Sequence, residues 1–129
     1  MPVPLHPKLR VAAVQAAPVF LDLDATIDKT IAIMKQAADQ GAQLVAFPET
    51  WIPGYPWWIW LTTPAQGMSY VQRYFDNGLV VGSAEFQRLA EAARQLGIWL
   101  SVGYSERAGG SLYIAQALFD DVGQVRMTR

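Results

Sequence analysis

The chain has 129 residues, of which 52% are hydrophobic and 16% charged, and its ten basic and eleven acidic side chains give a formal net charge of -1. This composition indicates a globular domain or part of one and argues against disorder, and the scattered basic residues offer no surface for nucleic acid. The chain contains no cysteine, which excludes disulfides, thiolate metal sites and a thiol nucleophile within it.

The amino-terminal residues, MPVPLHPKLR, contain no apolar segment of the signal-peptide type, and nowhere do 18 apolar residues follow one another. These two features predict no membrane span and a cytoplasmic location. The high apolar fraction also predicts that some surface is covered by something outside this segment.

A strand, a helix and a second strand are predicted at the start of the chain. Residues 8–16 form a short apolar run that Pro18 ends, and residues 43–47 form another that ends at Pro48. Between them, residues 25–40 repeat apolar side chains at helical spacing, with Asp22 or Asp24 as N-cap and Gly41 as C-terminal cap. A βαβ unit of this kind favours parallel strands, and ligands gather beyond the carboxyl ends of such strands.

The second half of the chain is predicted to be richer in strands. Pro53, Pro56 and Pro64 interrupt the chain around residues 54–77, where we expect only short helical turns. Ser83 is the expected cap of a helix that runs to Leu96. Strands are then expected at residues 98–104, at residues 111–119 and from Gln124 onward. No terminating signal follows the last strand, so residues 1–129 are expected to be the N-terminal part of one longer domain.

Glu49 is the candidate catalytic residue, because it lies just beyond the second predicted strand and before a dense group of aromatic residues. Indole and phenol rings remove water from a carboxylate, which favours its protonated form and suits a general base near neutral pH. Two interpretations stay open at this point. Glu49 either acts on a substrate in a poorly hydrated hollow or accepts hydrogen bonds from nearby backbone N–H groups.

Five aromatic residues lie within the ten positions 51–60, shortly after Glu49, and a short loop cannot bury all of them. We expect two or three of them to line a pocket or an interface and the others to pack in the core. The five are Trp51, Tyr55, Trp57, Trp58 and Trp60.

The segment AFPETWIPGYPWW resembles the first glutamate motif of the nitrilase superfamily, the carbon–nitrogen hydrolases, and its Gly-Tyr-Pro resembles the nitrilase branch. The residues from VAAVQ to AFPE resemble the family's opening strand, helix and second strand. GYSERAGGSLYIAQALFDDVGQV resembles its later strand, turn and hairpin. The resemblance covers nearly the whole chain.

This resemblance implies an α/β fold, the αββα sandwich of the nitrilase type, of which this chain is expected to be an incomplete N-terminal half. It implies hydrolysis of a small-molecule nitrile to a carboxylic acid and ammonia by a glutamate, a lysine and a cysteine through a thioimidate. It implies no metal and no organic cofactor. The complete form is expected to be a homo-oligomer, either a dimer or a spiral.

Glu49 matches the family's glutamate, which deprotonates the thiol and later passes protons to the leaving ammonia. Tyr55 matches a position that usually borders the substrate pocket, and Trp57 is a second substrate-binding candidate; simple packing is the alternative for both. The family's lysine and cysteine fall after the end of this chain. Ile114 stands where the family often has asparagine.

Other functions stay open. The chain could belong to an amidase, a carbamoylase or a cyanide-hydrating member of the same superfamily, or it could be a truncated, non-catalytic assembly module. An unrelated α/β binding domain does not explain several family-like segments in the right order. Because the nucleophile is absent, the chain alone is expected to be catalytically silent. Because a half sandwich exposes sheet edges and apolar faces, the chain is also expected to associate.

Overall fold

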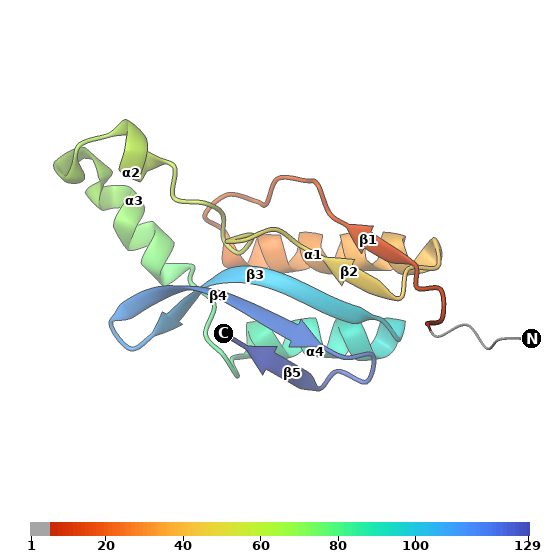
Figure 1. Ribbon diagram of the computed structural model, residues 1–129. Coiled ribbons are helices and arrows are strands. Elements are labelled where there is room, and N and C mark those ends of the chain that lie inside the picture. The colour runs from red at the N-terminus through yellow and green to blue at the C-terminus, as the bar shows by residue number, and fades with distance from the viewer. Residues whose placement is uncertain (1–5) are drawn as a thin grey trace, which may run out of the picture.

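The computed structural model describes residues 6–129, which form one five-stranded sheet with two long helices against one face and a helical arm at one end (Figure 1). The elements in chain order are β1 (Val11–Ala13), α1 (Leu23–Asp39), β2 (Leu44–Ala46), α2 (Trp58–Leu61), α3 (Pro64–Asp76), α4 (Ala84–Leu96), β3 (Trp99–Ala108), β4 (Ser111–Phe119) and β5 (Val125–Thr128).

The strands lie in the order β1-β2-β3-β4-β5. The first three are parallel, as the βαβ pattern predicts, and β4 and β5 are antiparallel to their neighbours. Two strand lengths differ from the prediction. Only three residues of the expected first strand pair with β2, because the chain leaves the sheet before Pro18, and β3 extends to Ala108 because β4 pairs along its full length.

The two long helices begin and end at the residues that the sequence indicates. Asp22 caps α1 by accepting a hydrogen bond from the Ala25 N–H at 2.9 Å, and Ser83 caps α4 by accepting one from Phe86 at 3.2 Å. Gly97 ends α4 in the left-handed conformation, with φ of 62°. Local capping and the apolar stripes of both helices therefore agree with the tertiary fold.

The core lies between the sheet and these two helices. Alternate residues of β3, Leu100, Val102 and Tyr104, are fully buried in one cluster with α1 and α4. The opposite face of the sheet is covered by no helix within residues 6–129 (Figure 1). The structure thus contains one helix layer and one sheet layer, which is half of the expected four-layer αββα sandwich.

The arm formed by α2 and α3 projects beyond the end of the sheet (Figure 1). The prediction of short helical turns was wrong for α3, which has 13 residues. Thr63 and Gln66 form a capping box and Pro64 occupies the first helical position, where its missing N–H costs nothing. Pro64 therefore starts a helix where the sequence analysis took it as a break. None of the helices between residues 6 and 129 combines the length and the hydropathy that a membrane span requires.

Candidate active site

Glu49 lies on an excursion of the chain that leaves the sheet after Phe47 and returns to β3 at Ile52, five residues later. The Phe47 N–H donates to Ser101 O at 2.9 Å, and the Ile52 N–H donates to Gly103 O at 3.3 Å. The chain advances five residues from Phe47 to Ile52, whereas their acceptors on β3, Ser101 and Gly103, are two residues apart. The additional residues therefore bulge out of the sheet. Thr50, at φ of 50°, makes the sharp turn that directly follows Glu49.

The excursion crosses the open face of β3 directly above Gly103. A Cβ atom built on Gly103 would lie 2.3 Å from Pro48 O and 2.7 Å from Glu49 Cα, so only glycine permits this approach. Because Val102 and Tyr104 point into the core, the missing Gly103 side chain would point to the opposite face. Glu49 is therefore fixed by a backbone contact above the open face of the sheet.

Two cavities meet at Glu49. One, of about 530 Å³, lies on the open sheet face and is lined by Glu49 together with Gly103, Gln116 and Arg129. The Gln116 amide donates to Ser101 Oγ at 2.9 Å, and Arg129 Nε donates to the Gln116 carbonyl at 3.2 Å. Polar groups therefore form the floor of this cavity beside the carboxylate.

The second cavity, of about 520 Å³, lies on the other side of Glu49 and is mostly apolar. It brings together two segments far apart in the sequence, since its walls come from the loop after β1 and from the excursion after β2. Its lining residues include Ala16, Pro18, Phe20, Trp51, Tyr55 and Trp57.

The Glu49 side chain is exposed, so the expected poorly hydrated hollow is not formed by residues 6–129. The aromatic residues after it point in different directions. Trp51 turns into the core, where its Nε1 donates to Thr30 Oγ1 at 2.8 Å, while Trp60 is 71% exposed on α2. These rings do not enclose the carboxylate, and the open sheet face leaves it in contact with solvent.

Tyr55 and Trp57 lie together at the wall of the second cavity, with ring centroids 4.7 Å apart. Trp60 Nε1 donates to the Tyr55 hydroxyl at 2.9 Å. An indole N–H is only a donor, so Tyr55 keeps its own hydroxyl hydrogen available. Trp57 also lines this cavity, although it is 61% exposed.

The base of the arm holds a buried phenol, that of Tyr74. Burial raises the pKa of Tyr74, the hydrogen bond with Ser105 lowers it, and the nearby Tyr55 raises it, with a net upward shift. Tyr74 also packs edge-on against the buried Trp58, with ring centroids 5.2 Å apart. Tyr74 thus stays neutral at physiological pH and anchors the arm to β3.

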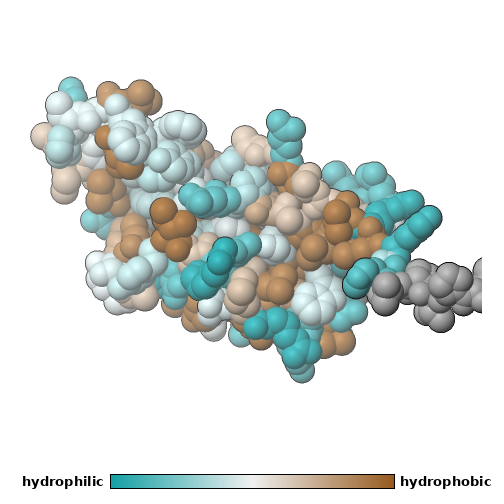
Figure 2. Space-filling model, in the orientation of Figure 1, coloured by the Kyte–Doolittle hydropathy of each residue, from teal (hydrophilic) through white to brown (hydrophobic). Residues whose placement is uncertain are grey.

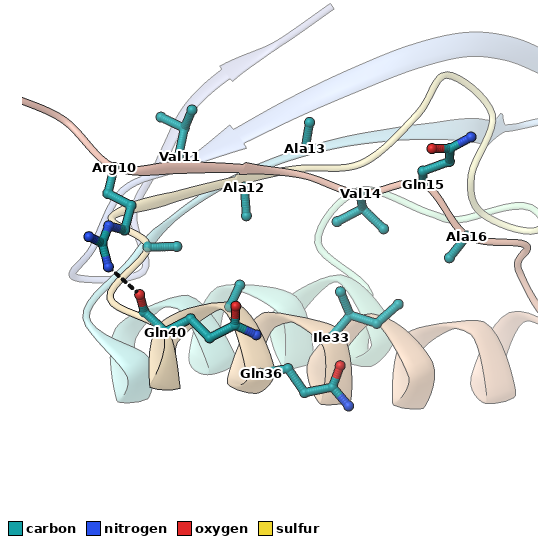
Figure 3. A pocket seen from close by; sticks show the side chains of 12 residues that line it. Arg10, Val11, Ala12, Ala13, Val14, Gln15, Ala16, Ile33, Gln36 and Gln40 are labelled. Carbon is teal, nitrogen blue, oxygen red and sulfur yellow. Dashed lines mark hydrogen bonds between the residues drawn. The ribbon is translucent and has the colours of Figure 1, made fainter.

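A cavity of about 560 Å³ lies away from Glu49, between β1 and α1 (Figure 3). Arg10 closes one end by donating to Gln40 O at 2.8 Å, and the other side chains that line it are small, apolar or neutral amides. This cavity offers no nucleophile or general base. Across residues 6–129, no three His, Asp or Glu side chains group as metal ligands.

Two residues at the site were missed by the sequence analysis. Gly103 had a usable signal, because a glycine inside a predicted strand indicates a bulge or a close backbone approach. Phe20 had none, since its place beside residues 53–54 depends on a long-range contact in which the Leu21 N–H donates to Pro53 O at 3.0 Å.

The family model of the carbon–nitrogen hydrolases matches residues 10–129. This chain belongs to the carbon–nitrogen hydrolase family. It is 60% identical over 116 residues to a nitrilase of Pseudomonas syringae pv. syringae (strain B728a) and 54% identical over 121 residues to an arylacetone-specific nitrilase of Alcaligenes faecalis. These alignments cover 90% and 94% of this chain but 34% of each relative.

The fold is also shared with a solved amidase from Nesterenkonia sp., at a TM-score of 0.67 and 27% sequence identity. The match covers 93% of this chain and 41% of the amidase chain. The chain therefore spans about a third of the length of the curated relatives that it matches, and it is similar to the nitrilase branch in sequence.

Proposed function

We propose that this chain supplies the general base of a nitrilase, which converts a nitrile and two water molecules into a carboxylic acid and ammonia. The observation that carries the proposal is the position of Glu49. An excursion between two hydrogen-bonded points of β3 holds it over Gly103, at the rim of two cavities, in a chain that belongs to the carbon–nitrogen hydrolases.

In this proposal the carboxylate of Glu49 moves protons and forms no bond to carbon. In this scheme it accepts the proton of a thiol, whose sulfur attacks the nitrile carbon and forms a thioimidate. One water molecule then adds to the thioimidate carbon, and the nitrogen receives protons through Glu49 and leaves as ammonia, which gives a thioester. Glu49 activates a second water molecule, which releases the acid and regenerates the thiol. The thiol must come from outside residues 1–129, because this chain has no cysteine.

Tyr55 and Trp57 are proposed to contact the substrate from the wall of the apolar cavity. The Tyr55 hydroxyl accepts a hydrogen bond from Trp60, so its hydrogen can be donated to a substrate nitrogen or to Glu49. Trp57 offers a ring face to the apolar part of the nitrile. Neither role requires a metal or an organic cofactor.

The test uses a chimaera in which residues 10–129 of this chain replace the matching segment of the Pseudomonas syringae nitrilase. Ammonia release from aliphatic and aromatic nitriles is measured for the parent chimaera and for Glu49→Gln. We expect a fall of about 10²–10⁴-fold in kcat, the usual range for loss of a general acid–base. Glu85→Gln, the same change on α4, is the matched control and should keep parent activity.

Retention of kcat within twofold in Glu49→Gln, with the same unfolding midpoint as the parent chimaera, would reject the proposal. The 129-residue chain alone is expected to release no ammonia from the same nitriles, because it contains no thiol. Turnover by the chain alone would show that another group acts as nucleophile.

A second candidate activity is amide hydrolysis, which the likeness to a solved amidase favours. The role of Glu49 is the same in both reactions, because each needs a base for the nucleophile and an acid for the leaving nitrogen. A panel of matched nitriles and amides, with cyanide included, separates the activities. We expect nitriles to be the better substrates, given the 60% identity to a nitrilase.

We also propose that the complete enzyme is a homo-oligomer. Large apolar side chains are exposed on the arm, including Trp60 at 71% and Leu61 at 78%, and Figure 2 shows hydrophobic residues at the surface over both the arm and the sheet. Exposed patches of this kind mark interaction surfaces. Light scattering of the chimaera, with and without Leu61→Glu, measures this: the substitution should lower the mass of the assembly.

A further inference from the structure

A second aromatic cavity adjoins the apolar cavity of Glu49. We name it the annex: it has about 300 Å³ and is lined by Phe20, Trp57, Trp58, Leu61, Thr62 and Tyr70. Phe20 and Trp57 also line the Glu49 cavity, so these two rings are walls common to both spaces. A substrate held at Glu49 is therefore separated from the annex only by side chains.

Phe20 is held in this wall by its surroundings. The backbone of the next residue is tied down, since the Leu21 N–H donates to Pro53 O at 3.0 Å. The ring lies on Gly54, where an added Cβ would come within 2.6 Å of Phe20 Cδ2. The ring edge also meets Trp58, at 6.3 Å between centroids. These contacts position the Phe20 ring between the two cavities, although the residue is 44% exposed.

The chemistry of the annex suits an apolar, aromatic occupant. Trp58 and Tyr70 stack there at 5.5 Å and an interplanar angle of 19°. The hydroxyl of Thr62 already donates to Trp58 O at 2.8 Å. No charged side chain lines the annex, so a charged substituent would lose its hydration without gaining an ionic partner.

We propose that Phe20 is a specificity-determining residue that limits the size of the substrate's apolar group by closing the Glu49 cavity against the annex. The substrate class is a nitrile whose carbon–nitrogen triple bond lies at Glu49 and whose aryl or alkyl group points toward Phe20. Replacing Phe20 with a smaller residue joins the two cavities and makes room for a larger aryl group. The inference rests on the proposed nitrilase function and adds to it the wall that selects among nitriles.

The experiment measures kcat/KM of the chimaera for butyronitrile, phenylacetonitrile and 4-biphenylacetonitrile. The readout is the ratio of kcat/KM for 4-biphenylacetonitrile to kcat/KM for butyronitrile. We expect Phe20→Ala to raise this ratio on the order of tenfold, mainly through a lower KM for the biphenyl nitrile, since buried hydrocarbon in a pocket is worth about 10–200-fold per group. Phe20→Trp should lower the ratio. General damage to the fold does not produce opposite shifts from the two variants.

Val19→Ala is the matched control, because Val19 is the neighbouring apolar side chain and lines neither cavity. It should leave the ratio within twofold of the parent. If the parent chimaera hydrolyses nitriles but Phe20→Ala leaves the ratio unchanged or lowers it, the inference is overturned and the proposed function stands. If the parent releases ammonia from amides and from no nitrile, the proposed function and the inference both fail.

Discussion

The two faces of the sheet differ sharply although the same strands form both. On the face toward α1 and α4, Leu100 and Val102 of β3 are completely buried. On the opposite face, β3 presents Ser101 and Gly103, and β4 presents Gln116 beside the Glu49 cavity. Alternation along each strand therefore separates the residues that hold the fold from those that surround the candidate base.

This difference shows how the site is built. The covered face needs volume and apolar contact, so its positions are filled by large aliphatic and aromatic residues. The open face near Glu49 needs room for a crossing backbone, so it has a glycine at the point of contact. The stability of the fold and the position of the base thus depend on neighbouring residues of one strand that point in opposite directions.

The largest effect is expected on the covered face. Leu100→Ala removes a fully buried side chain from the core and should lower the free energy of unfolding of the 129-residue chain by about 2–5 kcal/mol. Ile114→Ala, on the open face at 68% exposure, should change it by less than about 0.5 kcal/mol. Urea unfolding of both variants measures the contrast.

Leu100→Ala and Ile114→Ala can also be compared in the chimaera, by their effects on the free energy of unfolding. If the rest of the enzyme covers the open face there, Ile114→Ala should cost more in the chimaera than in the chain alone, while the cost of Leu100→Ala stays the same. Equal costs for the two variants in the chain alone would mean that the two faces are not different environments.

The next effect concerns the backbone contact below Glu49. Gly103→Ala places a methyl group against Pro48 O and Glu49 Cα, which must move. Overpacking of this kind costs about 1–3 kcal/mol, and the displaced carboxylate should lower kcat of the chimaera more than it changes KM. Gly110→Ala is the control, because a Cβ there meets nothing within 4 Å. Unchanged kcat in Gly103→Ala would mean that the position of Glu49 does not depend on this contact.

Much of the fold follows from local pattern. Asp22, Ser83 and Gly97 bound the long helices as predicted, and the apolar stripe of α1 faces the sheet, because capping and periodicity are decided within a few residues. The length of β1 and the helix α3 did not follow. Strand length depends on what a distant partner can pair with, and Pro64 can either break a helix or begin one.

The candidate site was likewise predicted only in part from the sequence. The motif predicts Glu49 as the candidate base, and the structure adds its support on Gly103. The sequence did not predict that Glu49 is exposed or that Trp51 turns toward Thr30 while Trp57 lies outside. Aromatic composition gives the number of rings but not their directions, which are set by the turn at Thr50 and by the start of α2.

A smaller effect is expected where β4 turns into β5. Burial raises the pKa of Asp120, but the N–H groups of Gln124 and Val122 and the Arg126 guanidinium together outweigh it, so the pKa lies below its ordinary value of 3.8. A lowered folded-state pKa contributes stability that is present above 3.8 and is lost as the pH falls below it.

The 129-residue chain should therefore lose stability as the pH falls below 3.8, and Asp120→Asn should reduce that loss while lowering stability at pH 7. Asp121→Asn, in the same turn, is the control and should follow the parent curve. Thermal unfolding midpoints from pH 7 to below pH 3.8 test the expectation. If the unfolding midpoint of Asp120→Asn falls with pH as steeply as that of the parent, ionisation of the Asp120 carboxyl does not contribute to stability.

The smallest effect is expected at the exposed ion pairs between α1 and α4. Arg88 of α4 pairs with Asp28 of α1 and lies 3.7 Å from Asp24. The two carboxylates are largely exposed and the Arg88 side chain is 41% exposed, so Arg88→Met should cost only about 0.2–1 kcal/mol. Lys35→Met is the matched control, because the Lys35–Asp39 pair lies within α1 and ties no elements together.

The free energies of urea unfolding of Arg88→Met and Lys35→Met should differ less in 1 M NaCl, because salt screens exposed charges. This follows from the comparison of the two faces. If burial of side chains such as Leu100 holds α1 and α4 to the sheet, charges on their outer surfaces can only add to that attachment. A loss for Arg88→Met as large as that for Leu100→Ala would mean that the ion pairs, and not the core, determine how the two helices cover the sheet.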